Sequence, residues 1–409
     1  MTVKFSDIED ARSVLEGVIA NTPVLPDNAL SAKIGIPAYS KAECLQRSGS
    51  FKIRGAYNKI SRLTPGEKER GVIAASAGNH AQGVALAAAL HNISSTIVVP
   101  KYAPLTKVNA TRNYGADVIL EGAGFDEAVA YSRKLQEERN LTYVHAFEDE
   151  KVIAGQGTIG IEIARDLPDA TVVVVPIGGG GIISGTAIAI KTLLPKARVI
   201  GVEAKNLAVI NESLRAGQPV EMPFKSTIAD GIAIKRPGSI SLELIKEYVD
   251  EVVEVTEEEI AYGIFHCVQN NHLVVEGAGA AGVAAVLANK IDLGKNDVVC
   301  SVLCGGNIDA NLLARILEQV LVREGRYIIV KSLVDDRPGG LAQMLKKVAE
   351  IGANVIEVFH RRALWLAPFG RVGVEMLLEV KDEEHGKEVI AYLEESGYQI
   401  QREEQGGWE

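Results

Sequence analysis

The stretch TVVVVPIGGGGIISGTAIAIKTLL, residues 171–194, changes character twice. Its first part, TVVVVPI (171–177), is almost continuously apolar, which is typical of a β-strand buried on both faces of a parallel sheet. Four glycines follow, and the periodicity of ISGTAIAIKTLL (183–194) predicts a helix. Residues 170–190 carry no charge, but Pro176 and the glycines would break a membrane-spanning helix. A strand, a turn and a helix explain the stretch better.

The same alternation of strands and helices continues on both sides of this stretch. Because parallel strands need crossover connections, it predicts βαβ units and a doubly wound α/β fold. The predicted strands are GVIAAS (71–76), STIVVP (95–100), DVILEG (117–122), ARVIGVEA (197–204) and DVVCSVLCGG (297–306), and the predicted helices are AQGVALAAALHNI (81–93), LTKVNATRNYG (105–115) and FDEAVAYSRKLQEERN (125–140).

The pattern changes after about residue 320. From RYIIVKSLVDD (326–336) to YQIQ (398–401), the predicted order is β-α-β-β-α-β, a ferredoxin-like arrangement. We therefore expect two domains, residues 1–320 and residues 325–403, joined near VREGR (322–326).

Composition excludes several classes of protein. The net charge of −10 argues against a surface that binds nucleic acid or an anionic membrane. The four cysteines form no CxxC pair and no disulfide framework, which fits a reduced, cytoplasmic setting. The N-terminus lacks the apolar core of a signal peptide.

The glycine loop PIGGGGIISG (176–185) predicts an anion site. Without Cβ atoms, the amides of Gly178, Gly179, Gly180 and Gly181 can point at a ligand, and the following helix adds partial positive charge. Phosphate is the most natural ligand. No Gly-Lys-Ser/Thr follows and no acidic ribose ligand is evident, so neither a P-loop nor a dinucleotide fingerprint is present. The alternative is a simple tight turn.

Two further loops follow predicted strands, where ligands bind in open parallel sheets. SAGNHAQG (76–83) offers polar groups suited to a carboxylate or a phenolic oxygen, although Ser76 or Asn79 could instead cap a helix. LCGGN (303–307) places a thiol at a sheet edge, although a buried structural cysteine is the commoner reading.

A single lysine, Lys52, lies within SGSFKIRGA (48–56), between Phe51 and Ile53 and among small residues. A buried lysine loses its proton more easily, because desolvation disfavours the ammonium. Pyridoxal phosphate needs a lysine that holds it as a Schiff base and an anion site for its phosphate. The phosphate loop, the lysine and the missing nucleotide fingerprint together point to this cofactor.

SGSFKIRGA, SAGNHAQG, GGGGIISG and CGGN, in this order, resemble the motifs of the fold-type II pyridoxal phosphate enzymes, and of the threonine dehydratase (threonine ammonia-lyase) family in particular. The resemblance covers residues 1 to about 320 and implies two open α/β subdomains, the smaller one (roughly 41–145) inserted in the larger. It also implies the following roles: Lys52 as the Schiff-base and proton-transfer lysine; Phe51 beside the cofactor ring; Asn79 at its phenolic oxygen; Gly178, Gly179, Gly180, Gly181 and Ile182 at its phosphate; Cys304 at its pyridine nitrogen; and Ser76, Gly78, Asn79, His80 and Glu276 around the substrate.

The family's reaction is the elimination of the β-hydroxyl of L-threonine, with release of 2-oxobutanoate and ammonia. L-serine stays open as a substrate, and a serine-preferring dehydratase or racemase is the alternative. Related racemases carry a second serine where Ala77 stands, and a carboxylate metal ligand where Val209 stands, six residues beyond Glu203. We therefore expect no efficient racemisation and no metal site.

The tail resembles an ACT domain, the small amino-acid-sensing module. DDRPGGLAQ predicts exposed amides at a helix start, so Gly339, Gly340 and Leu341 would bind the carboxylate of an effector and Asn354 its amine. Isoleucine is the expected effector and a homodimer or homotetramer the expected assembly. A purely dimerising module is the alternative. An alternative of another class is a non-catalytic amino-acid sensor, against which Lys52 argues.

Overall fold

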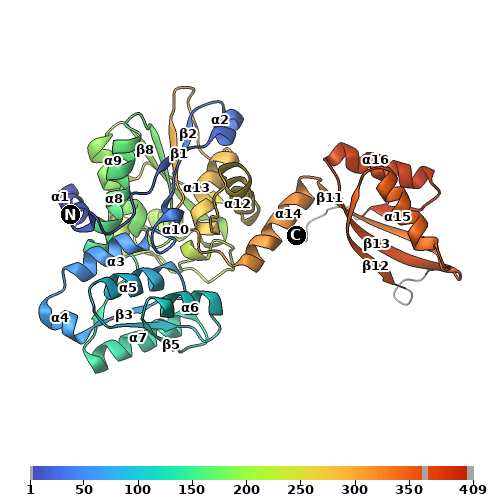
Figure 1. The fold of residues 1–409 in the computed structure, drawn as a ribbon. Helices are drawn as coiled ribbons and strands as arrows, with labels where there is room; N and C mark the ends of the chain where they lie inside the picture. The colour runs from blue at the N-terminus through green and yellow to red at the C-terminus, as the bar shows by residue number, and fades with distance from the viewer. Residues whose placement is uncertain (1–2, 362–366, 403–409) are drawn as a thin grey trace. The chain divides into compact units, whose positions relative to one another are not determined.

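The computed structural model describes residues 3–361 and 367–402. The chain forms two compact units that divide between Ala310 and Asn311 (Figure 1). The predicted division at 320–325 stays a prediction, and helix α14 (Ala310–Arg323) ends within VREGR (322–326), the segment in which we expected the join. No described helix combines the length and apolar character needed to cross a bilayer.

The first unit contains a large six-stranded sheet in the order β1-β2-β10-β7-β8-β9. All neighbours are parallel except β1 and β2, as predicted for a mainly parallel sheet. Every residue of β7, the strand inferred from TVVVVPI, is buried. The strands are β1 (Val24–Pro26), β2 (Ala38–Lys41), β7 (Val172–Pro176), β8 (Arg198–Ala204), β9 (Glu251–Val255) and β10 (Val299–Val302).

A smaller parallel sheet in the order β5-β4-β3-β6 lies within the same unit. Its strands are β3 (Val72–Ala75), β4 (Ser95–Val99), β5 (Asp117–Leu120) and β6 (Thr142–Tyr143). A separate apolar core beneath α5 and β4 supports it. The two sheets, one mainly and one wholly parallel, confirm the predicted α/β fold class. Each sheet also has strand ends at which ligand-binding loops can meet.

Helices flank both sheets. Figure 1 shows α8 and α9 on one side of the large sheet and α12 and α13 on the other. The helices are α1 (Phe5–Leu15), α2 (Asn28–Ile34), α3 (Lys52–Ser61), α4 (Pro65–Arg70), α5 (Asn79–Leu90), α6 (Leu105–Asn113), α7 (Phe125–Arg139), α8 (Glu150–Asp166), α9 (Gly181–Leu193), α10 (Val209–Ala216), α11 (Ser239–Tyr248), α12 (Glu257–Asn271) and α13 (Gly277–Leu287), with short 3₁₀ turns η1 (Glu43–Leu45), η2 (Lys205–Leu207) and η3 (Asp230–Ile232).

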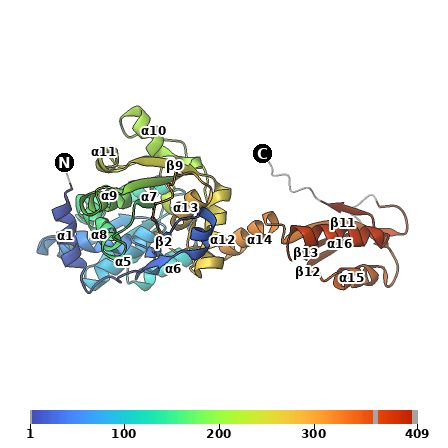
Figure 2. The same cartoon turned by 90° about the horizontal axis from the view of Figure 1, so that it is seen from above.

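The second unit has the predicted ferredoxin-like order. Its antiparallel sheet runs β12-β13-β11-β14, and Figure 2 draws this unit in orange and red. Met344 and Val348 of α15 and Val389 of α16 are part of its buried core. The elements after α14 are β11 (Tyr327–Asp335), α15 (Gly340–Glu350), β12 (Asn354–Arg361), β13 (Arg371–Glu379), α16 (Glu383–Glu395) and β14 (Ile400–Arg402). The predicted domain end at residue 403 lies outside the described residues.

Candidate active site

The segment that precedes Lys52 and the predicted loop LCGGN lie side by side in the first unit. The amide of Phe51 donates a hydrogen bond to the carbonyl of Cys304 (3.1 Å), and the amide of Gly306 donates to the carbonyl of Gly49 (2.9 Å). Ser50 and Gly305 form an antiparallel bridge between the same segments. The loop that carries the lysine is therefore joined directly to the loop that carries the thiol.

Lys52 begins helix α3 immediately after this junction. Its Nζ donates to the carbonyl of Ala146 (3.1 Å) and lies 5.0 Å from the centre of the Phe51 ring. Desolvation lowers the pKa of Lys52 to about 8, although negative charge on Cys304 or Glu276 would oppose this shift. A substantial fraction of the amine is therefore neutral near neutral pH, as a nucleophile or base requires.

Asn79 and Glu276 connect the second predicted loop to this junction. Asn79 begins α5, and its Nδ2 donates to Glu276 Oε1 (2.5 Å). The amide of Glu276 donates to the carbonyl of Gly305 (3.0 Å). Burial, together with the negative charge of Asp230, raises the pKa of Glu276 to about 7. Glu276 thus lies between Asn79 and the LCGGN loop.

The side chain of His80 is buried and uncharged. Its Nε2 lies 2.8 Å from the carbonyl of Val144, which can only accept, so Nε2 carries the hydrogen. Burial and the positive charge of Lys52 lower the pKa of His80 to about 3, and the imidazole stays neutral. Ser76 Oγ accepts from the amide of Gly78 (3.1 Å). This loop therefore presents mainly backbone amides at the start of α5.

The four-glycine loop forms a buried cradle at the start of α9. Gly180 adopts φ +95°, a left-handed conformation that favours glycine, and a Cβ on Gly179 would lie 2.3 Å from the ring of Phe147. Within the described part of the chain, the amides of residues 178–182 donate to no protein atom. Because buried amides are almost always paired, five bare ones at a helix N-terminus fit an anion such as phosphate.

Cys304 is buried, and burial raises the pKa of its thiol well above the ordinary value. The thiol is therefore neutral at physiological pH. All four cysteines are free and buried. Unlike a carboxylate, a neutral thiol cannot keep a neighbouring ring nitrogen protonated.

Glu203, which lies six residues before the position compared above with a metal ligand, binds backbone amides. Its two carboxylate oxygens accept from the amides of Ile210 (2.7 Å) and Asn211 (3.0 Å) in the first turn of α10. Among the described residues, no three histidine, cysteine or acidic side chains lie close enough together to bind a metal ion.

Sequence reasoning missed the segment VHAFED (144–149). Its Ala146 carbonyl holds Lys52, and its Phe147 ring lies against Gly179, so it connects the lysine to the glycine cradle. The amide of Glu148 donates to His145 Nδ1 (2.8 Å), which fixes the turn. A carbonyl acceptor leaves no signal in a sequence, but the position of the segment directly after a parallel strand could have drawn attention to it.

A second feature missed from the sequence is a buried network of charges beneath α3. Arg54 donates to both oxygens of Glu43 (2.7 Å each) and to both oxygens of Glu162 (2.6 and 2.8 Å). Lys41 also pairs with Glu162. Two cations and two carboxylates balance, so the network is neutral overall and anchors the helix that carries Lys52.

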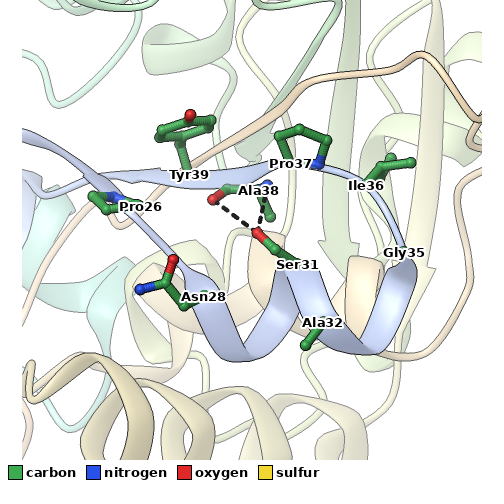
Figure 3. A pocket seen from close by; sticks show the side chains of 9 residues that line it. All are labelled: Pro26, Asn28, Ser31, Ala32, Gly35, Ile36, Pro37, Ala38 and Tyr39. Atoms are coloured by element: carbon green, nitrogen blue, oxygen red, sulfur yellow. Dashed lines mark hydrogen bonds between the residues drawn. The ribbon is translucent and has the colours of Figure 1, made fainter.

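A pocket of about 450 Å³ lies elsewhere on the first unit, between β1, α2 and β2 (Figure 3). Two residues of the pocket wall bind each other, because Ser31 Oγ accepts a hydrogen bond from the amide of Ala38 (2.9 Å). It is lined by Pro26, Asn28, Ser31, Ala32, Gly35, Ile36, Pro37, Ala38 and Tyr39, none of which we predicted as a site residue.

The predicted effector residues do not gather within one copy of the second unit. Gly339, Gly340 and Leu341 lie at the start of α15, whereas Asn354 follows its end. An eleven-residue α-helix is ~16 Å long, which separates the two groups. Asn354 is exposed, and its Nδ2 donates to Glu379 Oε2 (3.2 Å).

Comparison with known proteins agrees with this geometry. Residues 15–305 match the family model described as pyridoxal-phosphate dependent enzyme. The chain is 50% identical to an L-threonine ammonia-lyase of Thermotoga maritima (97% of this chain, 99% of that protein) and 44% identical to one of Geobacter sulfurreducens (96% and 98%).

Two solved structures share the fold. The processed form of threonine deaminase isoform 2 from Solanum lycopersicum has a TM-score of 0.73 and 38% identity, covering 77% of this chain and 92% of that one. Maize serine racemase has a TM-score of 0.74 and 32% identity, covering 79% and 99%. The family match spans Lys52, the loops at 76–83 and 176–185 and the first part of the LCGGN loop, and the chain therefore belongs to the family of pyridoxal-phosphate dependent enzymes.

Proposed function

We propose that the chain is an L-threonine ammonia-lyase, which converts L-threonine to 2-oxobutanoate and ammonia. The observation that carries this proposal is a lysine of lowered pKa placed where three strand-end loops meet. The names of the Thermotoga and Geobacter relatives, which align over almost the whole chain, support the choice of substrate.

The residues present fit the cofactor. The bare amides of residues 178–182 would hold its phosphate, Lys52 its aldehyde carbon and Asn79 its phenolic oxygen. Phe51 would lie beside the ring and Cys304 at the ring nitrogen. When bound, pyridoxal phosphate supplies an aldehyde that condenses with amines and a ring that withdraws electrons from the substrate Cα.

The protein's own groups would orient the substrate and move its protons. The backbone amides at the start of α5, next to Ser76 and Gly78, suit the substrate carboxylate. Lys52 in its neutral form would remove the Cα proton, since its pKa of about 8 leaves it unprotonated part of the time. Glu276 adds a second group that titrates near neutral pH.

A second candidate is a preference for L-serine. The similarity to maize serine racemase favours it. A hydrophobic pocket discriminates a single methyl group by only ~1–3 kcal/mol, so both substrates are expected to react at different rates. Racemisation is not favoured, because Ala77 cannot donate a proton where related racemases use a serine.

The second unit would regulate the first by binding an amino acid, isoleucine being the expected effector. The separation of Gly339 from Asn354 supports a site shared by two copies of the unit, and hence a homodimer or homotetramer. Any inhibition of threonine binding would be reciprocal, since coupling free energies are symmetric. Four free thiols support a reduced, cytoplasmic setting.

The test is a substrate assay on the purified protein supplied with the cofactor. We expect 2-oxobutanoate to form from L-threonine. L-serine should react at a different rate, and isoleucine should change the rate with L-threonine. Lys52→Ala should lower kcat by roughly 1,000-fold or more. Lys59→Ala is the matched control, because Lys59 lies on the same helix and pairs outward with Asp149 (2.7 Å). Equal activity in the two variants would contradict the proposal.

A further inference from the structure

Asn307, the last residue of LCGGN, contacts both loops that flank the candidate site. Its Nδ2 donates to the carbonyl of Ser48 (2.9 Å) and to Oδ1 of Asn79 (2.8 Å). Gly49 leaves room for this amide, because a Cβ there would lie 2.4 Å from Asn307 Oδ1. Asn307 thus joins the lysine loop to the first residue of α5.

We propose that Asn307 is a positioning residue that determines which end of the Asn79 amide faces the cofactor. A side-chain amide can turn by half a rotation and exchange its donor and its acceptor. At a phenolic oxygen that carries negative charge, only the N–H end is favourable. The proposal rests on the proposed position of Asn79 at that oxygen.

The direction of the whole chain of hydrogen bonds follows from one backbone carbonyl. The carbonyl of Ser48 can only accept, so Asn307 must turn its NH₂ group toward it. The second hydrogen of that group then points at Asn79, whose oxygen must accept it. If Asn307 were turned round, its oxygen would face two acceptors.

Asn79 is held from the opposite side as well. With its oxygen bonded to Asn307, its NH₂ group faces Glu276, to which it donates one hydrogen. The second hydrogen has no acceptor among the residues that the structure describes. It is therefore available to a ligand, and both neighbours favour the same orientation of the amide.

Three substitutions separate this role from simple packing. Asn307→Ala removes the donor and leaves the Asn79 amide oriented by Glu276 alone. Asn307→Asp keeps the size but replaces Nδ2 with an oxygen that faces both the Ser48 carbonyl and Asn79 Oδ1, which favours the reversed Asn79 amide. Asn206→Asp is the matched control, since Asn206 is also half-buried and donates to a carbonyl, that of Ser226 (2.8 Å), and to Glu257 (3.2 Å).

The readouts are the dissociation constant of pyridoxal phosphate and the position of its absorption band in the bound state. The loss of one well-oriented hydrogen bond predicts about fivefold weaker binding in Asn307→Ala, a larger loss in Asn307→Asp, and a shifted band in both. Asn206→Asp should match the wild type. Neither readout needs threonine, so an absence of threonine activity would count against the proposed substrate and leave this test intact.

A double-mutant cycle decides whether Asn307 acts through Asn79. If it does, Asn307→Ala will weaken cofactor binding in the wild type but change it less than twofold in the Asn79→Ala background. An equal loss in both backgrounds, or a wild-type band in both Asn307 variants, would overturn the proposal. If Asn307→Asp fails to fold, the cycle with Asn307→Ala still gives the answer.

Discussion

The molecule contains two glycine loops that begin a helix in the same way and differ in everything around them. Gly180 before α9 and Gly339 before α15 adopt nearly the same left-handed conformation, φ +95° and +94°. The first is buried among bare amides, whereas Gly339 is exposed and the amide of Gly340 already donates to the carbonyl of Arg337 (3.1 Å). A helix N-terminus therefore becomes a complete anion site only when neighbouring segments bury it and leave its amides unpaired.

The largest expected contrast concerns the charges of each unit: a buried network beneath α3 in the first, and a surface pair on α15 in the second. Arg54→Met would leave the buried Glu43 carboxylate without its guanidinium partner and Glu162 paired only with Lys41, and we expect the free energy of unfolding to fall by ~3–5 kcal/mol. Lys347→Met is the matched control near the second loop, because Lys347 pairs with Glu350 at the surface. Denaturant unfolding measures the free energy of unfolding of both variants. Equal losses would show that the buried network contributes no more to stability than a surface ion pair.

The second-largest effect is expected when a methyl group is added to the first loop. Gly179→Ala would place a Cβ 2.3 Å from the Phe147 ring, which has to move together with the cradle. We expect cofactor affinity to fall roughly 100-fold, equivalent to ~2.7 kcal/mol. Titration of the cofactor absorbance tests this, and wild-type affinity in Gly179→Ala would mean that the cradle is not tightly packed.

The pH dependence of cofactor uptake distinguishes Lys52, which the first loop would face across the cofactor, from surface lysines. Lys52 is protonated below its pKa of about 8, so the rate at which the apoenzyme takes up cofactor should rise with pH, with a midpoint near 8. Glu276→Gln removes a negative charge that favours the ammonium, and it should move the midpoint to lower pH. A midpoint above 10 would show that Lys52 is not desolvated.

The same pKa predicts how stability changes with pH. The unfolded chain binds a proton at Lys52 up to pH 10.5, its ordinary pKa, whereas the folded protein releases it near pH 8. Stability from this group is therefore lowest below pH 8 and is regained as the pH rises toward 10.5. Lys52→Met should remove this contribution, which unfolding of the apoenzyme at several pH values would detect.

The smallest effect is expected in the second loop. A Cβ on Gly339 would meet no atom within 4 Å, so only its left-handed backbone penalises a side chain. Gly339→Ala should lower the stability of the second unit by about 1 kcal/mol. Thermal unfolding measures this, and a loss as large as that in Arg54→Met would mean that this loop is also closely packed.

The sequence predicted the parts of the fold and site that depend on local pattern. The valines of β7, the glycines after them and the elements of the second unit can each be recognised from a short, continuous stretch of sequence. The structure then brings Lys52, Asn79, Glu276 and Cys304 together, as the resemblance implied. Their chemical roles stay predictions.

The remaining features depend on residues far apart in the chain. Lys41, Glu43, Arg54 and Glu162 each look like an ordinary surface charge, and only the packing of α3 against α8 pairs them. The carbonyl of Ala146 contributes through the backbone, which any residue type shares. Pattern reasoning cannot find contacts of these two kinds.

The most direct test of the central claim is to reduce the cofactor-loaded protein with borohydride, digest it and locate the pyridoxyl group by mass spectrometry. If the buried junction of the three loops is the active site, the group will be on Lys52 and nowhere else in appreciable amount. A label on another lysine, or no label on Lys52, would contradict the account.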